Sequence, residues 1–555
     1  MPNRLSMVRY NPSPERHSSK GALPQQRTGM AAANSSLFRP LPEPPARNAW
    51  LAWGGGMAAV YLVCTFASWG RTLLEDEIWS LSHGERSLLW LLRYIRGDLV
   101  HPPLWYVLAS WWTKLFGLTD AAAKALPLVF NLPALLLFPR LAQRCTEHWR
   151  LASLLFAAVY WRIGSVMGLA RMYGLLVLLV IVALLLWERW RRRPSAGVLV
   201  AWGGVMLLMV FTHYSGVLLL GAFVVVEWLF GARPASARWS LLLVAGLVGL
   251  ALVPWLLYVW PVYQVRGLEH NLGWVRSPHQ VLGQLPFFFL SYIHPGFNPF
   301  DDLRELPPLR VRIAAYAFAI GLHLVLGVFA WRGRRLGEAH TARSWLGPLV
   351  VLVLLPIVLV YLFSLIVHPA LDARFLLGLL PAYWLLMAVA GESAGEAGRW
   401  LLFGVILPWV LLSVAVTLPA AGPAPVRAAV DAVAAEYRPG DLLLVECRVG
   451  VSVWWEWTHR LGRLEELRAI GCERWRWWVP GVATPRDAEL AALRARRIWL
   501  IYVQQAERQR LEVLLAGQGF RSVQRSGPRW VALYASTEAS VSTSWTVGRR
   551  RSRPD

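Results

Sequence analysis

Long apolar runs, separated by short polar or basic segments, occupy the chain from Trp50 to about residue 419. A helix that crosses a bilayer needs about 20 apolar residues, and these runs reach or approach that length with their flanks. They lie near residues 50–69, 124–139, 151–168, 172–188, 198–212, 214–231, 239–260, 310–331, 344–367, 374–390 and 400–419. The pattern predicts an all-α polytopic membrane module over residues 49–419, with about 11 transmembrane helices.

The composition excludes other classes of protein. Of 555 residues, 56% are hydrophobic and 16% are charged, whereas about a quarter are charged in soluble domains. The chain is therefore not a soluble enzyme, a fibrous protein or a mainly disordered one, and an outer-membrane barrel would show short alternating strands. The net charge of +23 is better explained by basic cytoplasmic loops than by nucleic acid, which we do not expect as a partner.

The distribution of basic residues predicts the topology. Residues 1–48 are rich in Pro, Ser and Arg and read as a disordered cytoplasmic tail. Alternate connections are basic and should face the cytoplasm, so the remaining ones face outward. Segment 103–117 is short, Trp-rich and carries Lys114, which suits a helix at the membrane interface. We therefore expect residues 71–123 to form one outer loop with interfacial helices, and residues 261–309 a second, long outer loop.

The composition changes at about residue 420. Residues 441–446, 497–503 and 529–535 read as strands and residues 505–516 as a helix, which predicts a small α/β domain over 420–538. The span count places it outside the cell, and residues 539–555 form a polar tail. Its tryptophans either stack on sugar rings or fill the domain core, and we favour packing. They are Trp454, Trp455, Trp457, Trp475, Trp477 and Trp478.

An acidic cluster of Glu75, Asp76 and Glu77 follows the first run. Adjacent carboxylates at a membrane surface repel one another, which raises the pKa of at least one of them. Such a cluster suits a general base for a hydroxyl acceptor, or a ligand of a divalent cation. The alternative is a solvated acidic stop after a helix.

Basic and aromatic residues recur at the other outward turns. His101 precedes two prolines that start the Trp-rich helix, and Asp98 is close enough in sequence to pair with it. Arg171 lies between two apolar runs, where a charge is costly and a guanidinium matches a phosphate; the alternative is a snorkelling side chain. Further residues of this kind are Tyr173, His213, Tyr214, Asp372 and Arg374. Walker, GxGxxG, HExxH and CxxC patterns are absent from the sequence.

The order of these elements resembles the bacterial glycosyltransferases of the GT-C superfamily, in the branch of family 39 protein mannosyltransferases and the lipid A aminoarabinose transferase. The resemblance covers residues 50 to about 390. It rests on Asp76-Glu77, His101-Pro102-Pro103-Leu104, Phe116-Gly117, Leu126-Pro127, Ala170-Arg171-Met172-Tyr173, Thr212-His213-Tyr214, and Arg374 with Pro381.

The resemblance implies a hexosyl- or pentosyltransferase in the inner membrane of a bacterium, with its active site on the outer face. The donor would be a sugar on a polyprenyl phosphate, and the acceptor a hydroxyl of a lipid, glycan or protein. Asp76 would be the base, with Glu77 as neighbour or alternative. Arg171 and Arg374 would hold the leaving phosphate, and His101, Tyr173, His213 and Tyr214 would line the site. No cofactor is implied, and a divalent metal stays open.

One departure from the family pattern bears on the site. Gly168 and Leu169 stand where related sequences often carry Gln and Glu. Three explanations remain: another acid such as Asp301, Asp302 or Asp372 substitutes, the acceptor differs, or catalysis is impaired. The rival functions are a transporter or flippase of lipid-linked sugars and a catalytically silent relative that binds such lipids.

Overall fold

The structure is a computed structural model of the chain. It describes residues 48–67, 69–84, 86–162, 167–231, 235–266, 309–336, 340–367, 373–411, 425–462, 467–470, 497–502, 519–524 and 531–536, with a few positions between 509 and 517.

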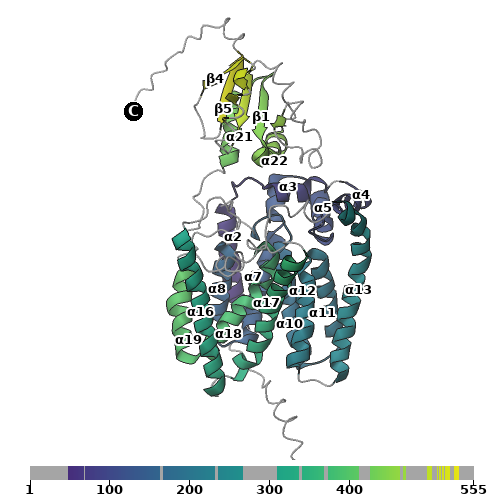
Figure 1. The fold of residues 1–555 in the computed structure, drawn as a ribbon, viewed down its shortest axis with the longest axis vertical. Helices are drawn as coiled ribbons and strands as arrows, with labels where there is room; N and C mark the ends of the chain where they lie inside the picture. Colours follow the sequence, from purple (N-terminus) through teal and green to yellow (C-terminus); the bar gives the residue numbers. More distant parts are fainter. Residues whose placement is uncertain are drawn as a thin grey trace, which may run out of the picture.

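A bundle of apolar helices makes up most of the molecule (Figure 1). Its helices are α2 (Ala49–Ala67), α7 (Leu128–Cys145), α8 (Trp149–Arg162), α10 (Tyr173–Arg192), α11 (Ala196–Thr212), α12 (Ser215–Phe230), α13 (Ala235–Arg266), α16 (Leu309–Leu336), α17 (His340–Ile366), α18 (Leu380–Ser393) and α19 (Gly395–Leu401). Within the described residues, 6 helical segments are long and apolar enough to cross a membrane. The chain is a polytopic helical membrane protein, and the figure of about 11 crossings remains a prediction.

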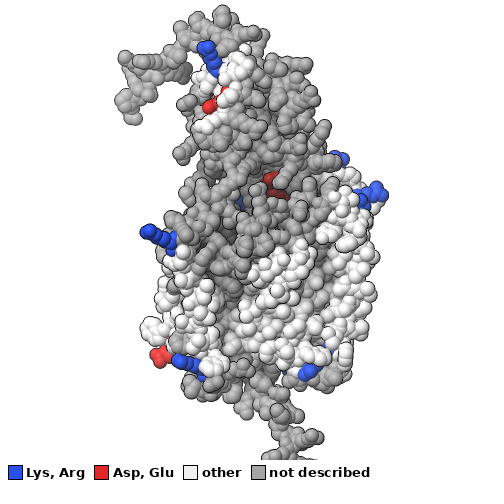
Figure 2. Space-filling view, in the orientation of Figure 1, with Lys and Arg blue, Asp and Glu red and all other residues white. Residues whose placement is uncertain are grey.

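Two of the predicted runs are not uniform α-helices. The run near 374–390 begins as a 3-10 helix, η3 (Ala373–Leu379), and continues as α18, which has a proline in its first turn. The run near 400–419 contains a π-helical turn, η4 (Leu402–Ile406), and is described as far as residue 411. Figure 2 shows the flank of the bundle as a broad uncharged belt, with the visible Lys and Arg side chains toward its two ends.

Four short helices follow α2, and Figure 1 shows α3, α4 and α5 at the end of the bundle nearest the C-terminal sheet. They are α3 (Glu75–Ser82), α4 (Leu88–Ile95), α5 (Leu104–Phe116) and α6 (Asp120–Ala125). The side chains of Ser87 and Thr119 cap α4 and α6. Helix α5 starts directly after the two prolines and ends at Gly117, whose φ of 78° suits a glycine. With 13 residues it is about 20 Å long, too short for a bilayer core.

The C-terminal region folds around a five-stranded sheet with the order β2-β1-β3-β5-β4. Strand β1 pairs in parallel with β2 and β3, whereas β5 is antiparallel to β3 and β4. The elements are α21 (Pro425–Glu436), β1 (Leu442–Glu446), α22 (Cys447–Trp455), η5 (Glu456–Arg460), β2 (Leu467–Ile470), β3 (Arg497–Ile501), β4 (Phe520–Gln524) and β5 (Val531–Ser536). The three predicted strands are present; β2 and β4 were not predicted, and the predicted helix 505–516 lies largely outside the described residues.

The described tryptophans of this region support packing. Trp455 and Trp457 are fully buried, and Trp454 is packed between the two hydrophobic cores. Trp475, Trp477 and Trp478 lie outside the described residues.

Candidate active site at the start of helix α3

Glu77 is enclosed by hydrogen-bond donors. Its side chain is fully buried, and the guanidinium of Arg71 pairs with both of its oxygens at 2.7 and 2.8 Å. The backbone N–H of Leu74 and that of Ala170 donate to the same carboxylate at 2.9 and 2.7 Å. Glu77 thus joins the first turn of α3 to the turn before α10.

Asp76, the adjacent residue, faces a different partner. Its carboxylate is 43% exposed, and Oδ2 lies 4.0 Å from Nη2 of Arg171. Ser80, one helical turn later, donates to the carbonyl oxygen of Asp76 at 2.8 Å. The acid is therefore accessible, and a cation stands beside it.

Arg171 is held inside the protein, in the turn before α10. Its side chain is 4% exposed, so it is not a snorkelling residue. Nη1 donates to Ser80 Oγ at 2.9 Å, and Nη2 lies 3.5 Å from Nε2 of His101. The Nε–H is buried and has no partner among the described residues. A buried guanidinium with an unused donor favours an anionic ligand.

His101 connects Arg171 to a second acid. The predicted pairing with Asp98 is confirmed, because Nδ1 of His101 lies 3.0 Å from Asp98 Oδ2. The hydroxyl of Tyr106 donates to the same oxygen. A carboxylate can only accept, so the hydrogen of a neutral His101 is on Nδ1 and Nε2 accepts from Arg171.

His213 carries the opposite tautomer. It follows the last residue of α11, and its Nδ1 accepts from the backbone N–H of Ser215 at 3.1 Å. In a neutral imidazole the single ring hydrogen is therefore on Nε2. This nitrogen is buried and has no hydrogen-bond partner within the described part of the chain. The rings of His101 and His213 are 5.6 Å apart, and Phe375 of η3 packs on both.

Electrostatics leave Arg171 as the cation of this group. Burial would lower the pKa of Arg171, but the nearby carboxylates of Asp76 and Asp98 raise it overall. Burial lowers the pKa of His101 despite the opposing charge of Asp98. Burial holds the pKa of His213 well below its usual value, and the positive charge of Arg171 acts in the same direction. Both imidazoles are therefore neutral near pH 7.

The remaining predicted site residues are Tyr173, Tyr214 and Arg374. Tyr173 is buried at the start of α10 beside Arg171. Tyr214 accepts a hydrogen bond from the indole of Trp255 at 3.0 Å, and burial raises its pKa to about 12. Arg374 precedes Phe375 in η3, and its side chain lies outside the described residues.

A divalent cation at the acidic cluster remains a prediction. Across the described residues, no three His, Cys, Asp or Glu side chains are grouped so as to hold a metal ion. The acids named as substitutes, Asp301, Asp302 and Asp372, lie outside those residues.

Sequence reasoning missed three residues that build the site: Arg71, Ser80 and Tyr106. Ser80 was accessible to prediction, since it lies four residues after Asp76 on one helix face. Arg71 also donates to the carbonyl oxygen of Gly168 at 2.7 Å. The carbonyl oxygen of Gly168 and the N–H of Ala170 thus bind the side chains of Arg71 and Glu77.

Comparison with known proteins concerns the fold. No protein-family model matches the chain, and no curated protein matches it in sequence. ArnT from Cupriavidus metallidurans bound to undecaprenyl phosphate is similar at 16% identity, over 88% of this chain and 98% of that chain, with a TM-score of 0.48. The apo state of the same protein is similar at 16% identity, over 87% of this chain and 98% of that chain, with a TM-score of 0.49. The Archaeoglobus fulgidus oligosaccharyltransferase tethered with an acceptor peptide is similar at 11% identity, over 88% of this chain and 74% of that chain, with a TM-score of 0.40. At these levels the likeness assigns no role to any residue.

Proposed function

We propose that the protein is a membrane glycosyltransferase of the GT-C type that moves a sugar from a polyprenyl phosphate to a hydroxyl acceptor at the outer face of the membrane. The observation that carries this proposal is the pairing of an accessible carboxylate, Asp76, with a buried cation, Arg171, at one end of an apolar bundle. A hydroxyl nucleophile needs a base, and a departing phosphate needs a cation.

In the proposed reaction Asp76 accepts the proton of the acceptor hydroxyl. The hydroxyl oxygen forms a bond to the anomeric carbon of the sugar while the bond from that carbon to the phosphate oxygen breaks. The electron pair of the broken bond leaves with the phosphate, so the products are the glycoside and the polyprenyl phosphate. Attack opposite the leaving group inverts the anomeric carbon.

The leaving phosphate would bind to donors that the protein leaves unused. Arg171 Nε–H and His213 Nε2–H are buried, and neither has a partner among the described residues. Both side chains adjoin His101, through the 3.5 Å contact of Arg171 and the ring contact of His213. A preorganised guanidinium stabilises the negative charge that develops as the phosphate departs. Arg374, next to Phe375, is a further candidate for the same phosphate.

His101 and Glu77 would hold this arrangement in place. His101, oriented by Asp98, accepts from Arg171 and so fixes the direction of the guanidinium. Glu77 has its oxygens occupied by Arg71 and two backbone N–H groups, which supports a holding role and leaves Asp76 as the candidate base.

The test is transfer of radiolabelled sugar from a panel of polyprenyl-phosphate sugars to membrane extracts. Purified wild type and Asp76→Asn are compared, and Glu396→Gln, an exposed acid on α19, controls for loss of a carboxylate. We expect transfer by wild type and the control, and a loss of about 100-fold or more in Asp76→Asn, as for removal of a general base. Undiminished transfer by Asp76→Asn overturns the assigned base. No transfer from any donor by folded, lipid-binding protein favours a silent relative or a transporter.

A further inference from the structure

Helix α22 belongs to two hydrophobic cores. Val451 and Trp455 belong to the hydrophobic cluster that extends through the helical bundle and the short helices α3 to α5. Val453 and the following Trp457 of η5 are buried in the core between the sheet and α21. The C-terminal domain is therefore not tethered by a linker alone, because one of its helices packs against α3 and shares a hydrophobic cluster with the membrane module.

The same helix contacts the segment that leads into α3. The hydroxyl of Ser452 donates to the carbonyl oxygen of Leu73 at 2.8 Å, and both groups are buried. Leu73 lies two residues before Glu75, the first residue of α3, and α22 packs against α3. The start of the helix that carries Asp76 thus rests on the C-terminal domain.

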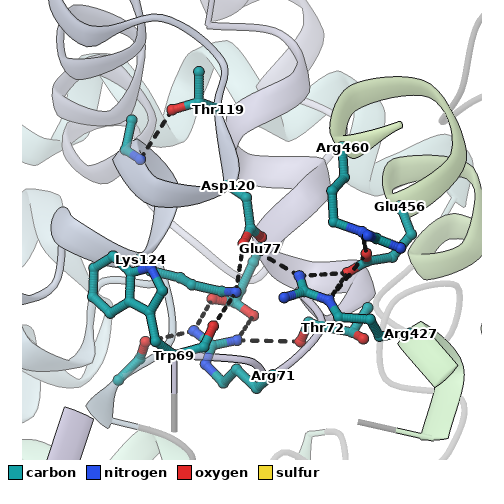
Figure 3. Close-up of polar contacts among 12 residues, drawn as sticks. Trp69, Arg71, Thr72, Glu77, Thr119, Asp120, Lys124, Arg427, Glu456 and Arg460 are labelled. Atoms are coloured by element: carbon teal, nitrogen blue, oxygen red, sulfur yellow. Dashed lines mark hydrogen bonds and ion pairs between the residues drawn. The ribbon is translucent and has the colours of Figure 1, made fainter. Parts of the chain in front are cut away.

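An ion network forms a second connection between the two parts (Figure 3). Arg427 of α21 pairs with Glu456 at 2.8 Å and with Asp120, the first residue of α6, at 3.2 Å. Asp120 also accepts from Lys124 at 2.6 Å, and Lys124 donates to the carbonyl oxygen of Trp69 at 2.6 Å.

The charged side chains of this network are largely buried. The side chain of Glu456 is fully buried, that of Lys124 is 2% exposed and that of Arg427 is 15% exposed. Burial opposes the charge of Arg427, but hydrogen bonds and charge interactions with Glu456 and Asp120 raise its pKa. Within the network, Glu456 also pairs with Arg460 and Asp120 also pairs with Lys124, so Arg427 is the residue whose ion pairs join the two parts.

We propose that the C-terminal domain positions Asp76, with Ser452 and Arg427 as positioning residues that fix residues 69–74 and the first turn of α3. This inference rests on the proposed glycosyl transfer for its catalytic part. The domain would then be required for turnover through the placement of Asp76.

The experiment uses the full chain in lipid nanodiscs. Arg427→Ala and Ser452→Ala are compared with wild type and with Arg427→Lys, which keeps the charge. Arg497→Ala is the matched control, because Arg497 pairs with Asp441 inside the C-terminal domain, at 3.3 Å. Hydrogen exchange is followed at the amides of α3, including the two that donate to the carbonyl oxygen of Leu74. Transfer is resolved into kcat and the KM for the donor.

We expect Arg427→Ala to speed exchange in α3 by about tenfold or more, which corresponds to local loosening. It should lower kcat by about tenfold while the donor KM changes by less than about twofold, because placement of the base is impaired and donor binding is not. Ser452→Ala should show smaller changes of the same kind. Arg427→Lys should restore most of both quantities, and Arg497→Ala should leave both at the wild-type values.

The outcomes separate this inference from the proposed function. Unchanged exchange in both Arg427→Ala and Ser452→Ala overturns the coupling, whatever the activity. Faster exchange with unchanged kcat overturns the positioning role. Absence of transfer by wild type refutes the proposed function alone, because exchange in α3 still tests the coupling. If Arg427→Ala does not fold, Ser452→Ala, which removes one hydrogen bond, decides the matter.

Discussion

Replacing Glu77 by Gln would separate the roles of the two adjacent carboxylates of α3. Oε1 of Glu77 accepts from Arg71 Nη2 and the Ala170 N–H, and Oε2 accepts from Arg71 Nη1 and the Leu74 N–H. In either orientation, the NH2 group of a glutamine would face two N–H donors. Two hydrogen bonds are lost, and the charge of Arg71 loses its counter-ion.

The expected cost follows from this geometry. Removal of one partner of a buried ion pair costs about 3–5 kcal/mol. Arg71 is 24% exposed and keeps its bond to the carbonyl oxygen of Gly168, so the lower end applies. We therefore expect Glu77→Gln to lower the free energy of unfolding by about 3 kcal/mol. Asp76→Asn, at an accessible carboxylate 4.0 Å from its cation, should change it by less than about 1 kcal/mol.

The assay is denaturant titration of the purified protein in mixed micelles, combined with the transfer assay. A double-mutant cycle with Arg71→Gln isolates the ion pair, for which we expect a coupling of about 2 kcal/mol. The reasoning would be refuted by a Glu77→Gln variant that is as stable as wild type yet inactive, with Asp76→Asn still active. That result would make Glu77 the base.

Three further predictions concern binding, pH dependence and packing. Arg171→Lys should weaken binding of a polyprenyl phosphate, measured by titration in detergent, by about tenfold or more through loss of charge-assisted hydrogen bonds; unchanged affinity contradicts the assignment. Burial, with a smaller effect of a nearby arginine, lowers the pKa of His83 to about 4. The unfolded state therefore binds a proton first as the pH falls, and the free energy of unfolding should drop by up to about 3 kcal/mol between pH 6.5 and 4. The variant His83→Phe should show a smaller drop over the same range, and an unaltered drop would exclude His83 as its origin. A Cβ at Gly174 would lie 2.2 Å from Asn131 Oδ1, so Gly174→Ala should lower the free energy of unfolding by about 1–3 kcal/mol in the denaturant titration. Gly204 has open space around it, so Gly204→Ala should leave that free energy unchanged. Equal stability of the two variants would refute the clash.

The parts of the fold that were predictable are those that follow from local pattern. Apolar runs located the long helices, and the two prolines before Leu104 located the start of α5. Strands β2 and β4 were not predicted from the sequence, because LRAI and FRSVQ form neither an apolar run nor a long alternation of apolar and polar residues. The shared role of α22 could not be predicted, because the sequence CRVGVSVWW does not reveal that its apolar faces enter two different cores.

The site was predictable as a set of residues and not as an arrangement. The pairing of Asp98 with His101 followed from a spacing of three residues. The division between Asp76 and Glu77 did not, because neighbours on a helix point about 100° apart and nothing local indicates which one meets Arg71. Contacts such as that of Arg427 with Asp120 join residues 307 positions apart, and no local pattern encodes them.

The two arginine–carboxylate pairs at the start of helix α3 illustrate why geometry decides function here. In a bidentate ion pair, the carboxylate oxygens and the N–H groups of the arginine are occupied by one another. Arg71 and Glu77 form such a pair, which suits them to fix the backbone. Asp76 and Arg171 approach only to 4.0 Å, and the Nε–H of Arg171 has no partner within the described residues. In the proposed reaction a phosphate would therefore bind the Nε–H of Arg171, and the accessible Asp76 beside it would accept the proton.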